Sequence, residues 1–275
     1  MTVLVLEGDA RQRWAAAELQ TLGYSVRFVT KEEYADGKLP CGADLALFPI
    51  PATRDGVHLA CSLEKPPPLL TLASGGPARV FGGGFSCDFI SRMRHSGREV
   101  TDLLSIPSFT EENAALTAEA ALGVGMTAAG QSMRGLSVGI VGYGRIASRL
   151  CRHLLLLGAR VRVFARSEEA RLAAMLDGAD AYDTALLRRH APALRLLFNT
   201  APAPLLTLRV TEKLSDCAIV ELASGRENIT LPEGRGDLSL HFAHSLPGKV
   251  FPVSAGRIIA RTLDQTMQIE GLRKT

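Results

Sequence analysis

Aromatic residues are scarce in this chain, and so is any excess of charge. Phe, Trp and Tyr make up 5% of the 275 residues, whereas glycine occurs 26 times. Few aromatics with many glycines fit an α/β protein rich in tight turns better than a β sandwich. Lys and Arg exceed Asp and Glu by 31 to 28. This balance is too even to indicate a nucleic-acid partner.

Paired cysteines and long hydrophobic runs are also missing. The five cysteines are scattered and none lies in a Cys-x-x-Cys arrangement, so neither a disulfide framework nor a zinc ribbon is indicated, and we expect buried free thiols. The longest apolar runs, such as Leu154 to Leu157, are far shorter than the roughly 20 residues of a membrane-spanning helix. The first residues carry no charged segment of a signal peptide. We therefore expect a soluble cytoplasmic protein.

Hydrophobic residues make up 47% of the chain, enough for a large core, and the length suggests about two domains at roughly 100–200 residues each. In the first half, short apolar runs alternate with helical or loop segments, which predicts a parallel sheet. Gly82, Gly83 and Gly84 predict a turn. The predicted strands of this half include Val3–Leu6, Ser25–Val29, 43–48, 69–72 and 79–81.

A long helix is predicted between the two halves. Thr110 to Asn113 has the composition of a capped helix start, and small residues then dominate as far as Gln131, which predicts close packing. We expect an N-terminal α/β domain over 1–109, this inter-domain helix over 110–132, a dinucleotide-binding domain over 133–252 and a helix over 253–275 that crosses back to the first domain. The fold class is α/β, with two Rossmann-like open parallel-sheet domains.

A glycine-rich turn in the second half predicts a dinucleotide site. Gly142 and Gly144 stand between a predicted strand over 137–141 and a helix with an apolar stripe. In such a turn the first glycine permits the tight bend and the second lets a pyrophosphate approach the backbone at the helix N-terminus. The remaining cofactor candidates in the turn are Tyr143, Arg145 and Ile146.

The end of the next strand favours NADP over NAD. NAD-selective sites usually place Asp or Glu about 20 positions after the turn, whereas this strand ends in Phe164-Ala165-Arg166-Ser167. Arg166 offers a fork of donors and Ser167 a hydroxyl, which suit a 2′-phosphate. Arg145 is a second candidate for a contact with the pyrophosphate or the 2′-phosphate, and a solvated surface arginine is the alternative.

Two later strand ends should line the nicotinamide side, because open α/β sheets bind ligands beyond the carboxyl ends of their strands. They offer Asn199, Thr200 and Pro202 after one strand and Ala223 and Ser224 after the other. Ordinary turn chemistry is the alternative for these residues.

His241 and His244 are three residues apart, but no carboxylate or thiol cluster accompanies them, so no metal site is predicted. We interpret Glu221 as a structural carboxylate at a strand end.

Taken together, these motifs resemble the A-subunit family of dipicolinate synthases along nearly the whole chain. The stretch from Gly75 to Gly84 departs from that family's pattern. The resemblance rests on Gly8-Asp9-Ala10-Arg11-Gln12, Asn113 with Thr117-Ala118-Glu119, Val141-Gly142-Tyr143-Gly144-Arg145, Ala165-Arg166-Ser167, Asn199-Thr200-Ala201-Pro202, Leu222-Ala223-Ser224 and Leu246-Pro247-Gly248-Lys249-Val250.

The resemblance implies an NADP-linked oxidation of dihydrodipicolinate, or of its hydrated lysine-pathway precursor, to dipicolinate during sporulation, with a homo-oligomeric state and a flavoprotein-like second subunit. A dicarboxylate substrate needs cations, and Lys249 is favoured because it precedes the N-terminus of the last helix; Arg11 and Arg226 are the other candidates. Asp9 accompanies Arg11 on the substrate side. Asn113 and Thr117 share a helix face and are candidates to orient the substrate, although capping is the alternative for Asn113.

Two other functions remain open at this stage. The chain could be a different two-domain NAD(P)-dependent dehydrogenase of a small carboxylate. It could also be a non-catalytic cofactor-binding subunit that scaffolds a flavoprotein partner. His244 as a general base, by analogy with hydroxyacid dehydrogenases, is a further alternative within the enzyme hypotheses.

Overall fold

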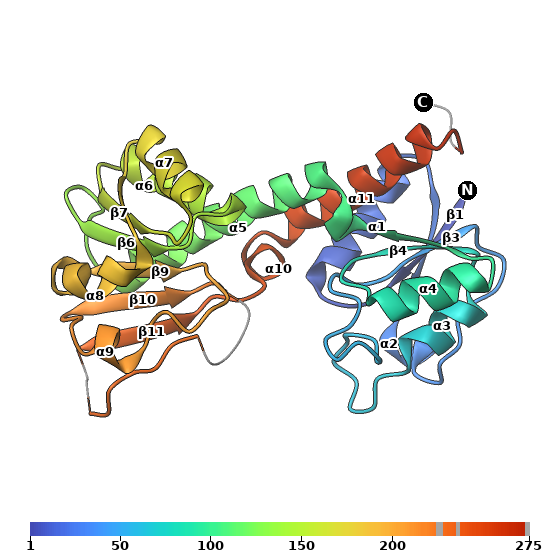
Figure 1. The fold of residues 1–275 in the computed structure, drawn as a ribbon. Helices are drawn as coiled ribbons and strands as arrows, with labels where there is room; N and C mark the ends of the chain where they lie inside the picture. The colour runs from blue at the N-terminus through green and yellow to red at the C-terminus, as the bar shows by residue number, and fades with distance from the viewer. Residues whose placement is uncertain (224–227, 235–236, 273–275) are drawn as a thin grey trace. The chain divides into compact units, whose positions relative to one another are not determined.

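The computed structural model describes residues 1–223, 228–234 and 237–272. The chain forms two compact units, one from Met1–Asn113 with the segment that begins at Pro247, the other from Ala114–Leu246. Each unit is a parallel sheet with helices on its faces (Figure 1). The predicted α/β class with two open parallel sheets is therefore confirmed.

The first unit has five parallel strands in the order β2-β1-β3-β4-β5. Alternate residues of β1 face opposite sides of this sheet. Val3 and Val5 pack in one core with α1 and α11, and Leu4 and Leu6 pack in the other with α3 and α4. The elements are β1 (Thr2–Leu6), α1 (Ala10–Thr21), β2 (Ser25–Val29), α2 (Lys31–Tyr34), β3 (Leu45–Leu47), α3 (Leu69–Gly75), β4 (Arg79–Gly82), α4 (Cys87–His95), β5 (Glu99–Asp102), η1 (Leu103–Ser105), α10 (Leu246–Val250) and α11 (Pro252–Ile269).

The last helix packs directly on the first one, as Figure 1 shows for α11 and α1. A Cβ atom at Gly256 would lie 2.6 Å from the backbone oxygen of Arg11 and 2.5 Å from Cβ of Trp14. The two helices approach so closely only because position 256 has no side chain. The chain thus returns to its first unit after completing the second.

One strand prediction in this unit was wrong. Residues 69–72 were expected to form a strand, yet Leu69–Gly75 is the helix α3; its Leu69, Leu72 and Ala73 are buried, at a spacing that suits a helix. Pro68 stands at the N-cap, where a proline costs no helical hydrogen bond.

The three consecutive glycines have separate structural causes. Gly82 ends β4, where a Cβ would lie 2.6 Å from Cζ of Phe85, so the prediction that all three form a turn was wrong at this position. Gly84 has a left-handed φ of +73°, and its N–H donates to the carboxylate of Asp102 at 3.0 Å. Gly82 and Gly84 therefore lie at a tightly packed strand end.

The second unit has six parallel strands in the order β11-β10-β9-β6-β7-β8. In this order the sheet grows from β6 in both directions, and crevices for ligands form where the direction reverses. The elements are β6 (Ser137–Val141), α6 (Arg145–Leu156), β7 (Arg160–Phe164), α7 (Glu168–Leu176), β8 (Asp180–Tyr182), η2 (Thr184–Leu186), α8 (Leu187–His190), η3 (Ala191–Ala193), β9 (Leu196–Asn199), α9 (Leu208–Thr211), β10 (Cys217–Glu221) and β11 (Leu238–Phe242).

The long helix α5 (Pro107–Ala129) begins in the first unit and continues into the second. It starts three residues earlier than the expected range, with Pro107 in the first helical position, where proline is favoured. Asn113 consequently lies inside the helix, so the expected cap at Thr110 to Asn113 was wrong. At Gly125 the predicted close packing is present, because a Cβ there would lie 2.3 Å from Cζ of Phe198 on β9.

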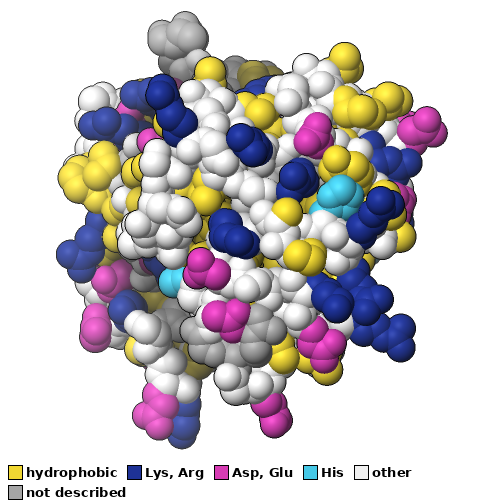
Figure 2. All heavy atoms as spheres, turned by 90° about the vertical axis from the view of Figure 1, so that its left-hand side faces the viewer, with side chains coloured by type: hydrophobic (Ala, Val, Ile, Leu, Met, Phe, Trp, Pro, Cys, Tyr) yellow, Lys and Arg dark blue, Asp and Glu magenta, His cyan; other side chains and the backbone are white. Residues whose placement is uncertain are grey.

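All five cysteines are free, but only part of the burial prediction was right. Cys151 and Cys217 are buried, Cys61 is half-buried, and Cys41 and Cys87 are exposed. Among the described residues, no helix combines the length and the hydropathy needed to cross a bilayer. In the view of Figure 2, Lys and Arg are scattered among acidic and hydrophobic groups, in keeping with the small net charge.

Candidate functional site

The glycine-rich turn joins β6 to α6, as the sequence predicted, and its two glycines differ in their surroundings. Gly142 has a left-handed φ of +87°, and a Cβ there would lie 2.7 Å from Oγ1 of Thr200. Gly144 is the N-cap residue of α6, and a Cβ there would meet no atom within 4 Å. The fold therefore requires a glycine at 142, whereas at 144 it leaves open space in front of the helix N-terminus.

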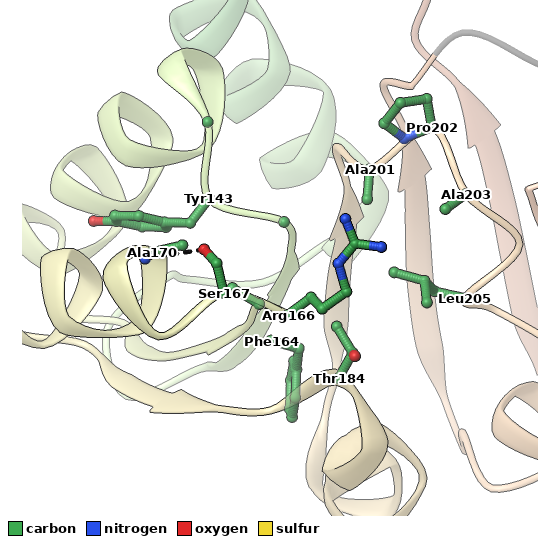
Figure 3. Close-up of a pocket in the computed structure, with 13 residues that line it drawn as sticks. Tyr143, Phe164, Arg166, Ser167, Ala170, Thr184, Ala201, Pro202, Ala203 and Leu205 are labelled. Carbon is green, nitrogen blue, oxygen red and sulfur yellow. Dashed lines mark hydrogen bonds between the residues drawn. The ribbon is translucent and has the colours of Figure 1, made fainter.

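A pocket of about 570 Å³ opens beside this turn. It lies at the carboxyl ends of β6 and β7 and against the segment that follows β9, which is where open α/β sheets bind ligands. No Asp or Glu is among its lining residues, and Arg166 is its charged group (Figure 3). The lining residues are Gly142, Tyr143, Gly144, Phe164, Ala165, Arg166, Ser167, Ala170, Thr184, Ala201, Pro202, Ala203 and Leu205.

Arg166 lies two residues after the end of β7 and is exposed to solvent. Figure 3 shows its guanidinium reaching across the pocket toward Ala201 and Leu205. Ser167 is the N-cap of α7, and its hydroxyl accepts a hydrogen bond from the N–H of Ala170 at 3.3 Å. A guanidinium and a helix N-terminus thus lie together at the place where dinucleotide sites recognise the ribose.

Arg171 supports this loop, a role that sequence reasoning missed. Its Nη1 donates to the carbonyl oxygens of Ala165 at 2.9 Å and Arg166 at 2.6 Å, and it pairs with Asp183 at 3.1 Å. The backbone that carries Arg166 is therefore fixed by side chains from α7 and from the start of η2. An arginine five residues after Arg166 was the available signal, but surface arginines are too common for it to be informative.

The other turn residues are oriented differently from one another. The Tyr143 side chain points away from the pocket (Figure 3), and its hydroxyl donates to Oδ2 of Asp177 at 2.5 Å. Arg145 opens α6 and is exposed, and Ile146 beside it is half-buried. Tyr143 and Arg145 therefore offer the site mainly their backbone N–H groups and, for Arg145, a cation at the helix start.

The β9 and β10 strand ends are occupied largely with each other. Asn199 is fully buried, and its Nδ2 donates to Oε2 of Glu221 at 2.7 Å. The hydroxyl of Thr200 donates to the carbonyl of Val141 at 2.8 Å, which fixes β9 against the glycine-rich turn. Of the candidates after β9, Pro202 lines the pocket, whereas Asn199 and Thr200 are not among its lining residues.

Glu221 is a fully buried carboxylate at the end of β10. Its Oε1 accepts a hydrogen bond at 2.7 Å from the N–H of Ala223, which is itself buried. Burial raises the pKa of Glu221 above the ordinary value, although the hydrogen bonds from Asn199 and Ala223 and the nearby His244 oppose this. The candidates Ser224 and Arg226 lie outside the described residues.

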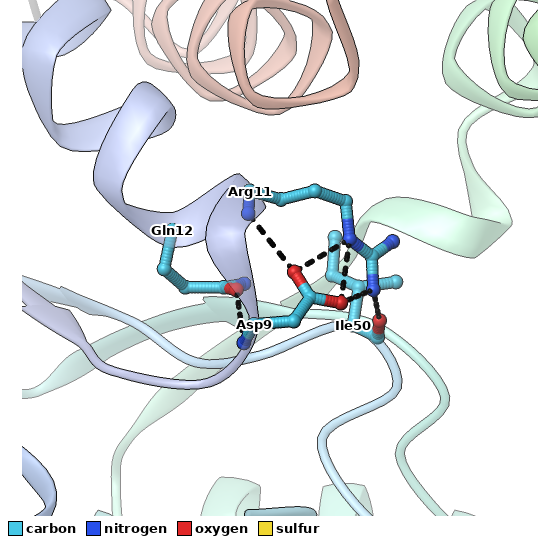
Figure 4. A network of polar contacts seen from close by, with 4 residues as sticks. All are labelled: Asp9, Arg11, Gln12 and Ile50. Carbon is cyan, nitrogen blue, oxygen red and sulfur yellow. Dashed lines mark hydrogen bonds and ion pairs between the residues drawn. The ribbon is translucent and has the colours of Figure 1, made fainter. Parts of the chain in front are cut away.

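The first unit brings Asp9 and Arg11 together at the start of α1 (Figure 4). Arg11 is 8% exposed; its Nη2 donates to Oδ2 of Asp9 at 2.7 Å and also to the carbonyl oxygen of Ile50. Asp9 also caps α1. A Cβ at Gly248 would lie 2.8 Å from Asp9 and 2.9 Å from Nε of Arg11, so the segment that carries Lys249 packs on this ion pair.

Lys249 itself lies exposed in the last turn of α10. Asn113 and Thr117 are both on α5, half-buried and buried respectively, and each has a polar partner in the protein. Glu119 is exposed on the same helix. Arg11, Asp9 and Lys249 therefore lie near one another in the first unit, while the pocket beside the glycine-rich turn belongs wholly to the second.

His241 and His244 have different neighbours in the structure. The part of the chain that the structure describes contains no group of three or more His, Cys, Asp or Glu side chains placed to bind a metal ion. The Nε2 of His241 lies 3.2 Å from the hydroxyl of Ser239 on the same strand, and the ring of His244 lies 5.9 Å from that of Phe242.

Comparison with known proteins agrees with the predicted resemblance. No protein-family model matches the chain. It is 29% identical to the A subunit of dipicolinate synthase from Bacillus subtilis (strain 168), with 97% of this chain and 96% of that protein covered. The crystal structure of the dipicolinate synthase A subunit from Bacillus halodurans matches at a TM-score of 0.78 and 22% identity, over 97% of each chain.

Dehydrogenases share the same fold, with lower TM-scores and lower sequence identities. Salmonella D-lactate dehydrogenase matches with a TM-score of 0.65 and 14% identity, over 98% of this chain and 97% of that one. At this identity the likeness shows the fold and no more. Sequence similarity, which extends over nearly the whole length of both proteins, connects this chain with the A subunit of dipicolinate synthase and confirms the resemblance that its motifs predicted.

Proposed function

We propose that this protein is the NADP-dependent oxidoreductase subunit of a dipicolinate synthase. In this role it oxidises dihydrodipicolinate, or its hydrated lysine-pathway precursor, to dipicolinate. The dehydrogenase-like architecture and the similarity to a dipicolinate synthase A subunit support the oxidoreductase role. The observation that carries the choice of NADP is Arg166, which lines a pocket without an acidic lining residue and stands where an NAD-selective site has a carboxylate.

The residues of the second unit fit a dinucleotide phosphate. The open space at Gly144 accommodates a pyrophosphate at the α6 N-terminus, where backbone N–H groups and the helix dipole favour an anion. Arg166 binds the 2′-phosphate as a charged fork of donors, and the Ser167 hydroxyl donates to the same group. Arg145 adds a cation at the helix start. NADP⁺, when bound, accepts the hydride that leaves the substrate.

The dicarboxylate substrate is bound by cations of the first unit. Lys249 is exposed, and Arg11 keeps Nη1 free of hydrogen bonds within the described residues, pointing away from Asp9 in Figure 4. These two groups hold the substrate carboxylates, while Asp9 fixes the Arg11 guanidinium. Asn113 and Thr117 orient the substrate ring. Oxidation removes a hydride and a proton, and the aromatic product supplies driving force, so orientation and charge complementarity carry much of the rate.

An assay of NADPH formation tests this function. The purified protein, with and without a flavoprotein-like second subunit, is mixed with freshly generated dihydrodipicolinate and NADP⁺, and NADPH formation is followed by absorbance. We expect one NADPH per dipicolinate, measured independently by chromatography. Absence of turnover in both conditions refutes the proposed activity.

A non-catalytic cofactor-binding subunit is the second candidate, and one observation favours it. The Asp9 carboxylate neutralises much of the Arg11 charge, which weakens the case for a dianion site in the first unit. Under this alternative the protein binds NADP(H) but supports turnover only in the partner's active site, so Lys249→Ala leaves turnover of the reconstituted complex unchanged. Under the leading proposal the same change raises KM for the dicarboxylate.

A different dehydrogenase of a small carboxylate would show turnover with another substrate and none with dihydrodipicolinate. With the leading activity, the protein functions in the cytoplasm of the mother cell of a spore-forming bacterium, as a homo-oligomer. Its partners are then the small dicarboxylate and the second subunit.

A further inference from the structure

The side chain of Tyr143 points away from the pocket, and its hydrogen bond to Asp177 holds the glycine-rich turn in place. Its hydroxyl donates to Oδ2 of Asp177 at 2.5 Å, and Oδ1 of the same carboxylate accepts from Nε of Arg152 at 3.0 Å. Asp177 is the C-cap residue of α7, and Arg152 lies on α6. One carboxylate, 17% exposed, therefore joins the turn, α6 and the C-terminal end of α7.

The protonation states suit this arrangement. Burial, reinforced by the hydrogen bond to Asp177, raises the pKa of Tyr143, so the phenol remains a donor at neutral pH. Burial also acts to raise the pKa of Asp177, but hydrogen bonds from Tyr143 and Arg152 outweigh it and lower the pKa below its ordinary value. The carboxylate is thus ionised. The buried thiol of Cys151, whose pKa burial raises to about 11, is a further hydrogen-bond neighbour of the phenol.

Tyr143 is the one residue between two glycines. Gly142 lies in the left-handed region and Gly144 has no neighbour near its Cβ position, so the backbone on each side of Tyr143 has more conformational freedom than at other residues. A side chain held by a charged acceptor removes that freedom. A turn fixed before the ligand arrives binds it more tightly, since less conformational entropy is lost on binding.

We infer that Asp177 is a positioning residue for the dinucleotide site: through Tyr143 it fixes the pyrophosphate-binding turn, and through Arg152 it joins that turn to α6. The inference rests on the proposed binding of NADP(H). It predicts a consequence that differs from that of Arg166. Loss of the hydrogen bond between Tyr143 and Asp177 weakens the binding of every dinucleotide that uses the turn, whether or not that dinucleotide has a 2′-phosphate.

The test measures binding of NADPH and NADH to the full-length protein by nucleotide fluorescence, for wild type, Tyr143→Phe and Asp177→Asn. Loss of a hydrogen bond to a charged group corresponds to roughly tenfold in a binding constant. We expect both Kd values to rise by about this factor in each variant, with their ratio unchanged. In turnover assays, KM for the cofactor should rise while kcat stays within about twofold.

Three further variants make the result interpretable. Asp177→Glu keeps the charge and should recover part of the affinity, and Arg152→Gln, which leaves the Tyr143 hydrogen bond in place, should have the smaller effect. Tyr182→Phe is the matched control, a half-buried tyrosine of the same unit that stacks on Phe164, and should bind as wild type does. Thermal unfolding checks each variant; Tyr143→Phe removes a single oxygen and decides the outcome if Asp177→Asn does not fold.

The outcomes separate this inference from the proposed function. Wild-type protein that binds neither nucleotide refutes the proposed cofactor and the inference together. Wild-type binding with unchanged affinity in Tyr143→Phe refutes the inference alone. A change in the ratio of NADPH to NADH affinity also overturns it, because the hydrogen bond between Tyr143 and Asp177 would then act on the 2′-phosphate loop instead of the turn.

Discussion

Replacement of Arg166 by Asp is the sharpest test of the cofactor assignment. The arginine is exposed, lines the pocket, and has no ion-pair partner within the described residues, so its removal leaves no buried charge behind and should not perturb the fold. The change removes a cation and introduces the carboxylate that NAD-selective sites use.

The magnitude follows from the lost contacts. A hydrogen bond to a charged group contributes about 1.5–3 kcal/mol, and each 1.4 kcal/mol is tenfold in a dissociation constant. Kd for NADPH should therefore rise by roughly 10- to 150-fold, and repulsion between Asp and the 2′-phosphate adds to this. NADH has no phosphate at this position, so its Kd should change by less than about threefold, since the new carboxylate can accept hydrogen bonds from the ribose.

Isothermal titration calorimetry with both nucleotides measures the two constants directly. Arg188→Asp is the matched control, because it makes the same change of charge at an exposed arginine of the same unit that is absent from the pocket lining. The control corrects for the long-range effect of net charge, which 0.15 M salt screens beyond about 8 Å. If NADPH and NADH lose affinity equally in Arg166→Asp, Arg166 is not the 2′-phosphate ligand and the preference for NADP has another cause.

Three other substitutions test the fold around the site. Gly144→Ala should leave the melting temperature within about 2 °C of wild type, because the added methyl meets no atom. The same change should lower the affinity for both NADPH and NADH, measured by the same titration. Unchanged affinities would show that no ligand approaches this position. Gly125→Ala should lower the free energy of unfolding by about 1–3 kcal/mol through overpacking against Phe198, measured by urea denaturation; an unchanged midpoint would contradict the close helix contact. Glu221→Gln tests the buried carboxylate, whose folded pKa is raised. A raised folded pKa stabilises the protein most below the unfolded value and less as pH rises through the folded one. The unfolding free energy of wild type relative to Glu221→Gln should thus fall as pH is raised from about 4 to about 7, the range above the ordinary carboxyl pKa, and a pH-independent difference would contradict the raised pKa.

The sequence by itself determined the two parallel sheets and the position of the glycine-rich turn. These features depend on local signals: apolar runs of strand length, the glycine spacing between Val141 and Arg145, and the change from period two to helical period around it. The sequence also showed that the residues directly after β7, Ala165 to Ser167, include Arg166 and no acid.

Tertiary structure alone decided which side chains around the turn face the pocket. Tyr143 and Asn199 were candidates for direct contact, but Tyr143 bonds Asp177 and Asn199 bonds Glu221. Those partners lie 34 and 22 residues away in the chain, and the pairing of distant residues leaves no periodic trace in a sequence. The same holds for Arg11, whose pairing with Asp9 was local while its bond to the Ile50 carbonyl required the fold.

The glycines show this division most clearly. All four of Gly82, Gly125, Gly142 and Gly256 are present because a Cβ would meet another part of the chain at under 3 Å, and that part is distant in the sequence in three of them. Gly144 differs because nothing in the protein occupies its Cβ position. Sequence shows that a residue is glycine; only the packing around it shows whether a side chain at that position would collide with the rest of the protein.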